Sequence, residues 1–271
     1  MNAITRAALG VAAFALSCTA AFGQKETADA IARYRQLLQD GNPAELVAAR
    51  GEALWKEKRG PKKTSLEQCD LGLGAGVVKG AYAQMPRYFA DTDQVMDFEG
   101  RVVHCMVTLQ GFDYATVTKS PYSGTGQRQT EIEALAAYGV EESRGVPVNI
   151  SQSHPKEQAS YDRGKQFFYM RAGPYDFSCA TCHGVTGQRI RLQDLPNIAA
   201  NKEDAQRAFT TWPAYRVSQG TLRTMQWRLN DCFRQQRWPE PVFASPATVD
   251  LITFLGVNAN GAKMDSPSIK R

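Results

Sequence analysis

The sequence predicts a mainly α-helical protein, and the observations that predict this come from its second half. Residues 160–171 form an amphipathic pattern and residues 248–256 an apolar run of helical length. Residues 221–236 hold good helix formers without an internal proline or glycine, and Pro239 ends that run. The chain of 271 residues is long enough for two modest domains.

The first and last of these predicted helices have features that suit close packing. Gly164 and Phe168 stand where the helix over 160–171 would meet another helix. The run at 248–256 ends at Gly256, which we expect to stop the helix. We therefore expect these two helices to cross each other.

Two segments between the predicted helices indicate where the domains divide. Residues 119–129 are rich in serine, proline and glycine and indicate a loop, and residues 141–155 hold two prolines and little apolar periodicity. The second segment is typical of a linker. The expected organisation is a first domain over residues 24–148 and a second over residues 149–271.

The first 23 residues have the pattern of a secretory signal peptide. Arg6 precedes an apolar run over residues 7–16, and small residues lie before Gln24. The run is too short to span a membrane, and no later segment is long and apolar enough to do so. We expect residues 1–23 to be removed and the remaining chain to be exported.

Cys179–His183 is the attachment sequence for a c-type haem, Cys-x-x-Cys-His. Two thiols at this spacing add to the two vinyl groups of one haem, and the following histidine becomes the proximal ligand of the iron. The alternatives are a redox pair with a chance histidine, or half a zinc site, for which the sequence has no second ligand pair of that spacing. His104 and His154 are expected to be structural or exposed. The apolar run over residues 101–109 is typical of a strand, so we expect His104 and the adjacent Cys105 to face opposite sides. A covalent haem in an exported chain indicates the periplasm.

The charge of the chain is mildly positive. It holds 32 Lys and Arg against 27 Asp and Glu, a formal net charge of +5. That surplus is small and scattered, so it does not indicate nucleic-acid binding. It suits a protein that handles small anions or docks an acidic partner.

The number of cysteines leaves one without an obvious role. The chain has six, of which Cys18 lies in the signal peptide and two bind the haem. In an oxidising compartment Cys69 and Cys105 are the natural disulfide pair, which would stabilise the first domain. Cys232 is then left over. A buried, inert thiol is the ordinary state of such a cysteine.

The surroundings of Cys232 favour a functional role. On a helix Arg228 and Cys232 lie one turn apart on one face, and a guanidinium beside a sulfur favours the thiolate. The alternative is that the arginines of this segment form a solvated face with Cys232 buried beneath it.

The second half as a whole has the pattern of a small cytochrome c domain, with the haem between crossed first and last helices. No histidine follows His183, so the sixth ligand of the iron would be Met225, Met264 or Cys232. A methionine is usual in an electron carrier, whereas a thiolate lowers the potential and suits sulfur chemistry.

Further motifs resemble the A subunit of the SoxAX cytochromes of bacterial thiosulfate oxidation, over nearly the whole chain after residue 23. In the second half they are Phe177–His183, Gly187–Arg191, Trp212–Arg216, Arg228-x3-Cys232 and Trp238–Pro241, and in the first half Cys69–Gly74, Val77–Gly80, Met85–Asp91 and Arg101–Cys105.

The resemblance implies roles for individual residues. Cys179 and Cys182 would hold one haem c and His183 would be its proximal ligand. Cys232 would be the distal ligand and active-site sulfur, which in the family is found as a persulfide. Arg228 would bind the substrate.

The resemblance also implies an activity, L-cysteine S-thiosulfotransferase. Thiosulfate would be joined to a cysteine of a SoxYZ-type carrier protein, and two electrons would pass through a SoxX-type cytochrome subunit to a soluble c-type cytochrome. Two alternatives remain: a plain periplasmic electron carrier with His183 and Met225 as ligands, and a non-catalytic docking subunit.

The chain departs from two-haem members of the family in its first half. Leu66 and Asp70 stand where a first cysteine and a histidine would be needed around Cys69. Neither can replace those residues. We therefore predict two cytochrome c-like domains, the N-terminal one without haem and held by the Cys69–Cys105 disulfide.

Overall fold

The computed structural model describes residues 33–34, 37, 41–190 and 193–270, among which helices predominate, so the mainly α-helical prediction is confirmed. The predicted signal peptide and Cys18 lie outside the described residues. The chain from Pro43 onward forms one compact unit. In the part of the chain that is described, no helix combines the length and the apolar character needed to cross a bilayer.

The first half of this unit has helices around one short hairpin, in which β1 and β2 pair antiparallel. Its elements are α2 (Ala44–Lys56), η1 (Tyr82–Gln84), β1 (Arg87–Phe89), β2 (Gln94–Met96), α3 (Phe98–Thr108), α4 (Tyr114–Thr118) and α5 (Glu131–Glu141).

The second half likewise has helices around a small sheet. Its strand order is β6-β5-β7, with β5 and β6 antiparallel and β5 and β7 parallel. Its elements are α6 (Pro155–Tyr169), α7 (Cys179–His183), β3 (Arg189–Ile190), β4 (Gln193–Asp194), α8 (Lys202–Thr210), β5 (Ala214–Arg216), η2 (Val217–Gln219), β6 (Thr221–Arg223), α9 (Met225–Gln235), α10 (Pro246–Asn258) and β7 (Ser268–Lys270).

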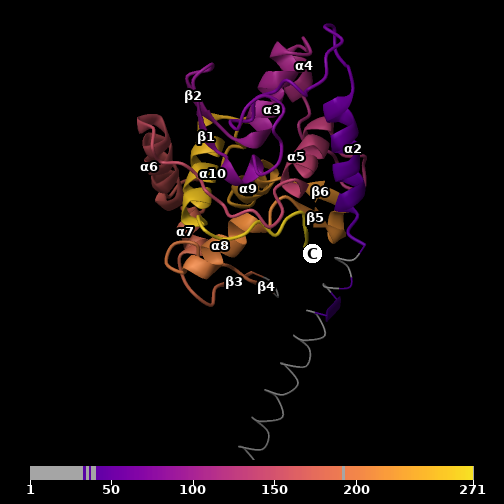
Figure 1. Ribbon diagram of the computed structural model, residues 1–271. Helices are drawn as coiled ribbons and strands as arrows, with labels where there is room; N and C mark the ends of the chain where they lie inside the picture. The colour runs from indigo at the N-terminus through magenta and orange to yellow at the C-terminus, as the bar shows by residue number, and fades with distance from the viewer. Residues whose placement is uncertain (1–32, 35–36, 38–40, 191–192, 271) are drawn as a thin grey trace, which may run out of the picture. The chain divides into compact units, whose positions relative to one another are not determined.

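Each half has a first helix packed on a last helix: α2 on α5, and α6 on α10 (Figure 1). A glycine marks each contact. A Cβ on Gly51 would lie 2.0 Å from the carbonyl oxygen of Ala134, and one on Gly164 would lie 1.9 Å from that of Asp250. Only glycine permits backbones this close. The predicted packing of Gly164 and the predicted meeting of these two helices are confirmed.

A second repeat links the hairpins to the helices that follow them. In the first half, β1 and β2 lead to α3, which Asp97 caps; in the second, β5 and β6 lead to α9, which Thr224 caps. The spacing from Arg87 to Cys105 equals that from Ala214 to Cys232. Both helices carry the same pattern, Arg101-x3-Cys105 on α3 and Arg228-x3-Cys232 on α9.

Three predicted elements differ from the structure. Residues 221–223 form strand β6, and α9 begins only at Met225, because the hydroxyl of Thr224 accepts a hydrogen bond from the amide of Trp227. The run around Cys105 was expected to be strand-like, but it forms α3. Gly256 lies inside α10 rather than at its end, and its missing Cβ makes room for the ring of Phe209.

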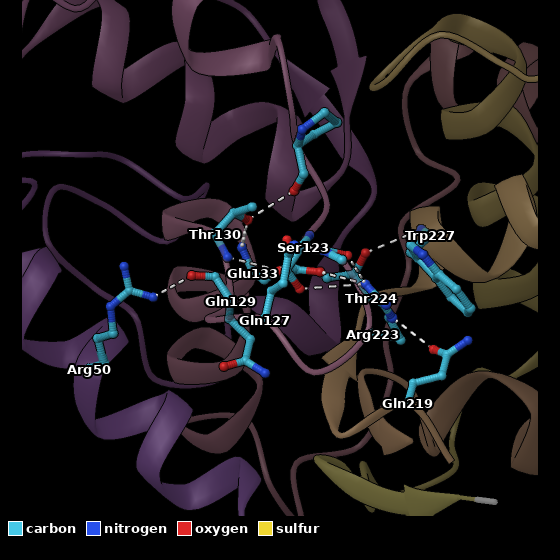
Figure 2. A network of polar contacts seen from close by, with 12 residues as sticks. Arg50, Ser123, Gln127, Gln129, Thr130, Glu133, Gln219, Arg223, Thr224 and Trp227 are labelled. Carbon is cyan, nitrogen blue, oxygen red and sulfur yellow. Dashed lines mark hydrogen bonds and ion pairs between the residues drawn. The ribbon is translucent and has the colours of Figure 1, made fainter. Parts of the chain in front are cut away.

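A buried ion pair joins the two halves (Figure 2). Arg223 of β6 is 2 % exposed; its Nη1 donates to the carbonyl of Ser123 at 2.6 Å and lies 3.4 Å from a carboxylate oxygen of Glu133, at the start of α5. Its guanidinium also stacks over Trp227 of α9, 4.5 Å from the ring centre. The first half therefore fixes where α9 begins.

Candidate functional site: the Cys-x-x-Cys-His helix and helix α9

Helix α7 is one short turn that carries the predicted attachment residues. Ser178 and Thr181 form a capping box at its start, with hydrogen bonds of 3.1 and 2.9 Å between side chains and amides. Cys179, Cys182 and His183 are three and four residues apart, so they share one face of the helix. Both cysteines are free and half-buried.

The ring of His183 is oriented by a backbone carbonyl. Its Nδ1 lies 2.9 Å from the oxygen of Pro196. A carbonyl only accepts, so Nδ1 must donate, which leaves Nε2 with the lone pair that binds a metal. Burial, together with the charge of Arg228, lowers the pKa of His183, against the opposing hydrogen bond to Pro196. The neutral, oriented ring fits a proximal ligand of haem iron.

The segments on either side of α7 expose apolar side chains suited to the faces of a porphyrin. Six of them are between 39% and 57% exposed: Tyr169, Met170, Tyr175, Phe177, Val185 and Ile190. Exposed apolar side chains gathered in one stretch of the chain are typical of a binding site. Together with the two thiols and the oriented imidazole, they fit a covalently attached haem.

Helix α9 brings Cys232 to the same place. Burial raises the pKa of Cys179 to about 12 and also raises the pKa of Cys182, and in both residues the electrostatic influence of Cys232 is the second cause. Such an influence requires proximity. The structure therefore brings together Cys179, Cys182, His183 and Cys232.

Arg228 lies at this site too, but it is not free. Its Nη1 donates to Asp231 at 3.0 Å, and its guanidinium lies 6.0 Å from the ring centre of Trp212. Asp231 also accepts from Arg234 and Gln235. Arg234 itself is largely exposed. One carboxylate thus holds the side chain of Arg228 in place.

The two methionines that are candidates for the sixth iron ligand are buried. Met225 is 4 % and Met264 2 % exposed, and both side chains pack in the main hydrophobic core. Cys232, by contrast, is half-buried.

The predicted disulfide is confirmed: Cys69 and Cys105 are bonded, with their Cα atoms 5.7 Å apart. Leu66 is fully buried, and Asp70 accepts hydrogen bonds from the amides of Gly72 and Gly74. The side chains at this place therefore have structural roles.

The remaining histidines have structural roles as well. Nδ1 of His154 accepts from the amide of Lys156 at the start of α6, and its ring stacks on Tyr88 at 3.7 Å. His104 lies 3.7 Å from a carboxylate oxygen of Asp91.

Sequence reasoning missed Trp238 as a positioning residue. Its indole N–H donates to the carbonyl of Ala172 at 2.8 Å, and its ring packs edge-on against Phe233 at 5.1 Å. It thus fastens the segment before α7 to the end of α9. The motif Trp-Pro-Glu-Pro, which begins at Trp238, marks this residue in the sequence but does not indicate what its side chain contacts. Asp231 and Arg216 were given no role either, although both lie within quoted motifs, because a single polar residue carries no pattern that shows what it contacts.

Comparison with known proteins identifies the family. The chain is 52% identical over 242 residues to the L-cysteine S-thiosulfotransferase subunit SoxA of Hydrogenophilus thermoluteolus, covering 89% of this chain and 88% of that one. A subunit of the same name from Hydrogenobacter thermophilus is 31% identical over 252 residues, 92% and 91% of the two chains.

This chain belongs to the SoxA family. The crystal structure of SoxXA from P. pantotrophus has the same fold, with a TM-score of 0.71 at 23% identity, over 88% of this chain and 84% of that one. The family model described as the SoxA/TsdA cytochrome c domain matches residues 50–148. That match covers the half that lacks the Cys-x-x-Cys-His motif.

Proposed function

We propose that this chain joins thiosulfate oxidatively to a cysteine of a SoxYZ-type carrier protein. The observation that carries this proposal is the meeting of Arg228 and Cys232 on α9 with the attachment helix α7. Relatives that cover most of the chain are named for this transferase activity. Those names do not favour a plain electron carrier.

In this proposal the chain would hold one haem c. Cys179 and Cys182 would form the thioether bonds, and His183 and Cys232 would be the residues that bind its iron. The haem supplies a site that takes up electrons one at a time. The bond from His183 to Pro196 keeps the imidazole in the required tautomer.

The proposed reaction is a two-electron oxidation. A thiol of the carrier loses its proton, a sulfur–sulfur bond forms between it and the terminal sulfur of thiosulfate, and two electrons leave. The products are the carrier S-thiosulfonate, one proton and two electrons. A SoxX-type cytochrome subunit and then a soluble c-type cytochrome would accept the electrons.

Arg228 would hold the thiosulfate. A guanidinium presents several N–H donors in one plane and suits the oxygens of a small anion. Asp231 engages one nitrogen, Nη1, of this group. The remaining donors can bind substrate while the ion pair fixes the direction of the side chain.

We further propose that the chain contains two cytochrome c-like domains, over residues 24–148 and 149–271, with haem only in the second. The matching helix pairs, the repeated Arg-x3-Cys pattern and the family match to residues 50–148 support this division. Leu66 and Asp70 supply neither a thioether nor an imidazole.

The partners and the compartment follow from the family and from the sequence. A related solved structure is titled as SoxXA, which supports a SoxX-type subunit beside this chain. The leader pattern in residues 1–23 supports export to the periplasm.

Replacement of Cys232 by serine tests the proposed function. We expect thiosulfate-dependent reduction of cytochrome c in the presence of the carrier to fall by roughly 100-fold or more, because the reaction loses its active-site sulfur. Asn230→Ser, a small polar change on the same helix, should retain activity. Retention of full turnover in Cys232→Ser with a normal haem content would refute the proposal.

A further inference from the structure

We propose that Arg216 is a second anion-binding residue beside Arg228, and that the pair selects dianions such as thiosulfate over monoanions of the same shape. This inference rests on the proposed function, because it names a residue of the same site.

Arg216 stands at the end of β5, next to the site. Its Cα pairs with Thr221 of β6 on one side and with Lys270 of β7 on the other. Its side chain is half-buried, and its buried Nε has no hydrogen-bond partner. Among the described residues, no carboxylate lies within ion-pairing distance of Arg216. A buried donor left unsatisfied is costly, and a ligand that accepts from it removes that cost.

Arg228 is the charged group with the largest influence on Arg216. Burial lowers the pKa of Arg216, and the charges of Arg228 and Arg223 lower it further, whereas Asp231 and Cys232 raise it. The two guanidinium groups are therefore near neighbours that repel each other. A second cation lies close by, since Nζ of Lys270 is 5.5 Å from the ring centre of Trp212, the ring that Arg228 also approaches.

The haem-free half of the chain shows what stands at these positions where no substrate is expected. By the shared spacing, Arg101 corresponds to Arg228 and Phe89 to Arg216. Arg101 stacks over the ring of Phe89, 4.1 Å from its centre. It is almost fully buried, and Asp91 accepts from it at 3.0 and 2.8 Å. There, an apolar ring, a carboxylate and the backbone carbonyl of Asp70, which accepts from Nε at 2.7 Å, surround the arginine.

The active half thus has a second guanidinium in place of that ring. Two like charges near each other repel, and the carboxylate beside them, Asp231, already pairs with both Arg228 and Arg234. A bound anion would offset the remaining repulsion. A dianion satisfies both groups, whereas a monoanion leaves part of the repulsion. The like-charged pair therefore favours the more highly charged ligand, in addition to attracting it.

The experiment compares thiosulfate with methanethiosulfonate, in which a methyl group replaces one oxygen and leaves a single negative charge. Dissociation constants of both anions are measured on the haem-loaded full chain in complex with its cytochrome partner. The variants are Arg216→Gln, Arg216→Lys and, as a control, Lys58→Gln, which removes an exposed positive charge just after α2.

We expect Arg216→Gln to weaken thiosulfate binding about 10-fold or more and to leave methanethiosulfonate within about 2-fold, because the lost charge matters most to the dianion. Arg216→Lys should restore part of the affinity for thiosulfate, since lysine keeps the positive charge but lacks the planar set of N–H donors of a guanidinium. Lys58→Gln should change neither constant.

Two results would overturn the inference: thiosulfate binding in Arg216→Gln equal to that of Lys58→Gln, or an equal loss for both anions, which indicates a structural role. The outcome is separate from that of the proposed function. If Arg216→Gln loses the preference for the dianion while the wild-type chain does not conjugate thiosulfate, the anion site is supported and the proposed activity is refuted. If Arg216→Gln keeps the preference while the wild-type chain is active, the activity is supported and the anion site is refuted.

Discussion

Asp231 and Trp238 illustrate how single side chains set the geometry of the site. Asp231 is nearly buried between two arginines and directs Arg228, while Trp238 ties α9 to the segment that enters the attachment helix. Chemistry fixes the spacing of Cys179, Cys182 and His183, so the sequence was enough to predict them. The contacts of Asp231 and Trp238 depend on chain segments that only the fold brings together.

Asp97 is a buried carboxylate whose protonation should affect stability. It caps α3 and accepts from Gln226 of α9 at 2.6 Å, and burial raises its pKa to about 6 from 3.8. Nearby Glu99, Glu133 and Tyr82 also have raised pKa values, with burial as the first cause. The folded chain thus binds protons that the unfolded chain releases between about pH 4 and 6.

The stability that Asp97 contributes is therefore complete below pH 4 and lost as the pH rises through 6. In the wild-type protein the free energy of unfolding should therefore fall between pH 4 and pH 7. In Asp97→Asn, which keeps the cap, we expect this fall to be smaller by about 3 kcal/mol. Urea unfolding of both proteins at several pH values measures this. Parallel pH profiles for the two proteins would contradict the role of Asp97.

Helices and strands were predictable to different degrees, and the reasons are physical. Long amphipathic helices such as α6 leave a pattern of apolar residues that the sequence displays. Strand β6 has three residues, too few to show a period, so the sequence predicts a helix that begins at residue 221 instead. The apolar positions around Cys105 are adjacent in pairs, which fits a buried helix face as well as a strand.

The contact of α6 with α10 depends on one glycine. A Cβ at Gly164 would lie 1.9 Å from the carbonyl oxygen of Asp250, so a side chain there must push the helices apart. We expect Gly164→Val to lower the free energy of unfolding by about 3 kcal/mol or more and to lower haem retention.

The matched control is Lys165→Val, at the next and exposed position of the same helix. It introduces the same β-branched residue without the contact, and should cost less than about 1 kcal/mol. Chemical denaturation of the wild-type protein and the two variants shows whether the loss of stability comes from packing or from helix propensity. Equal losses in both variants would contradict the packing argument.

The two halves of the chain share a pattern of helices and differ in what their Arg-x3-Cys sequences do. In the first half Arg101 is fully paired and Cys105 is bonded to Cys69. In the second half Arg228 has donors to spare and Cys232 is a free thiol. The buried pair of Glu133 and Arg223 links α5 to the start of α9. The first half of the chain therefore helps to position the proposed catalytic helix.

The sulfur of Cys232 as the distal ligand of the haem is the claim on which the proposed chemistry depends. The absorption spectrum of the oxidised, haem-loaded chain tests it most directly. We predict that the weak band near the red end, which a methionine ligand produces, is absent. Its presence in the wild-type protein would show a thioether on the iron and would contradict this account.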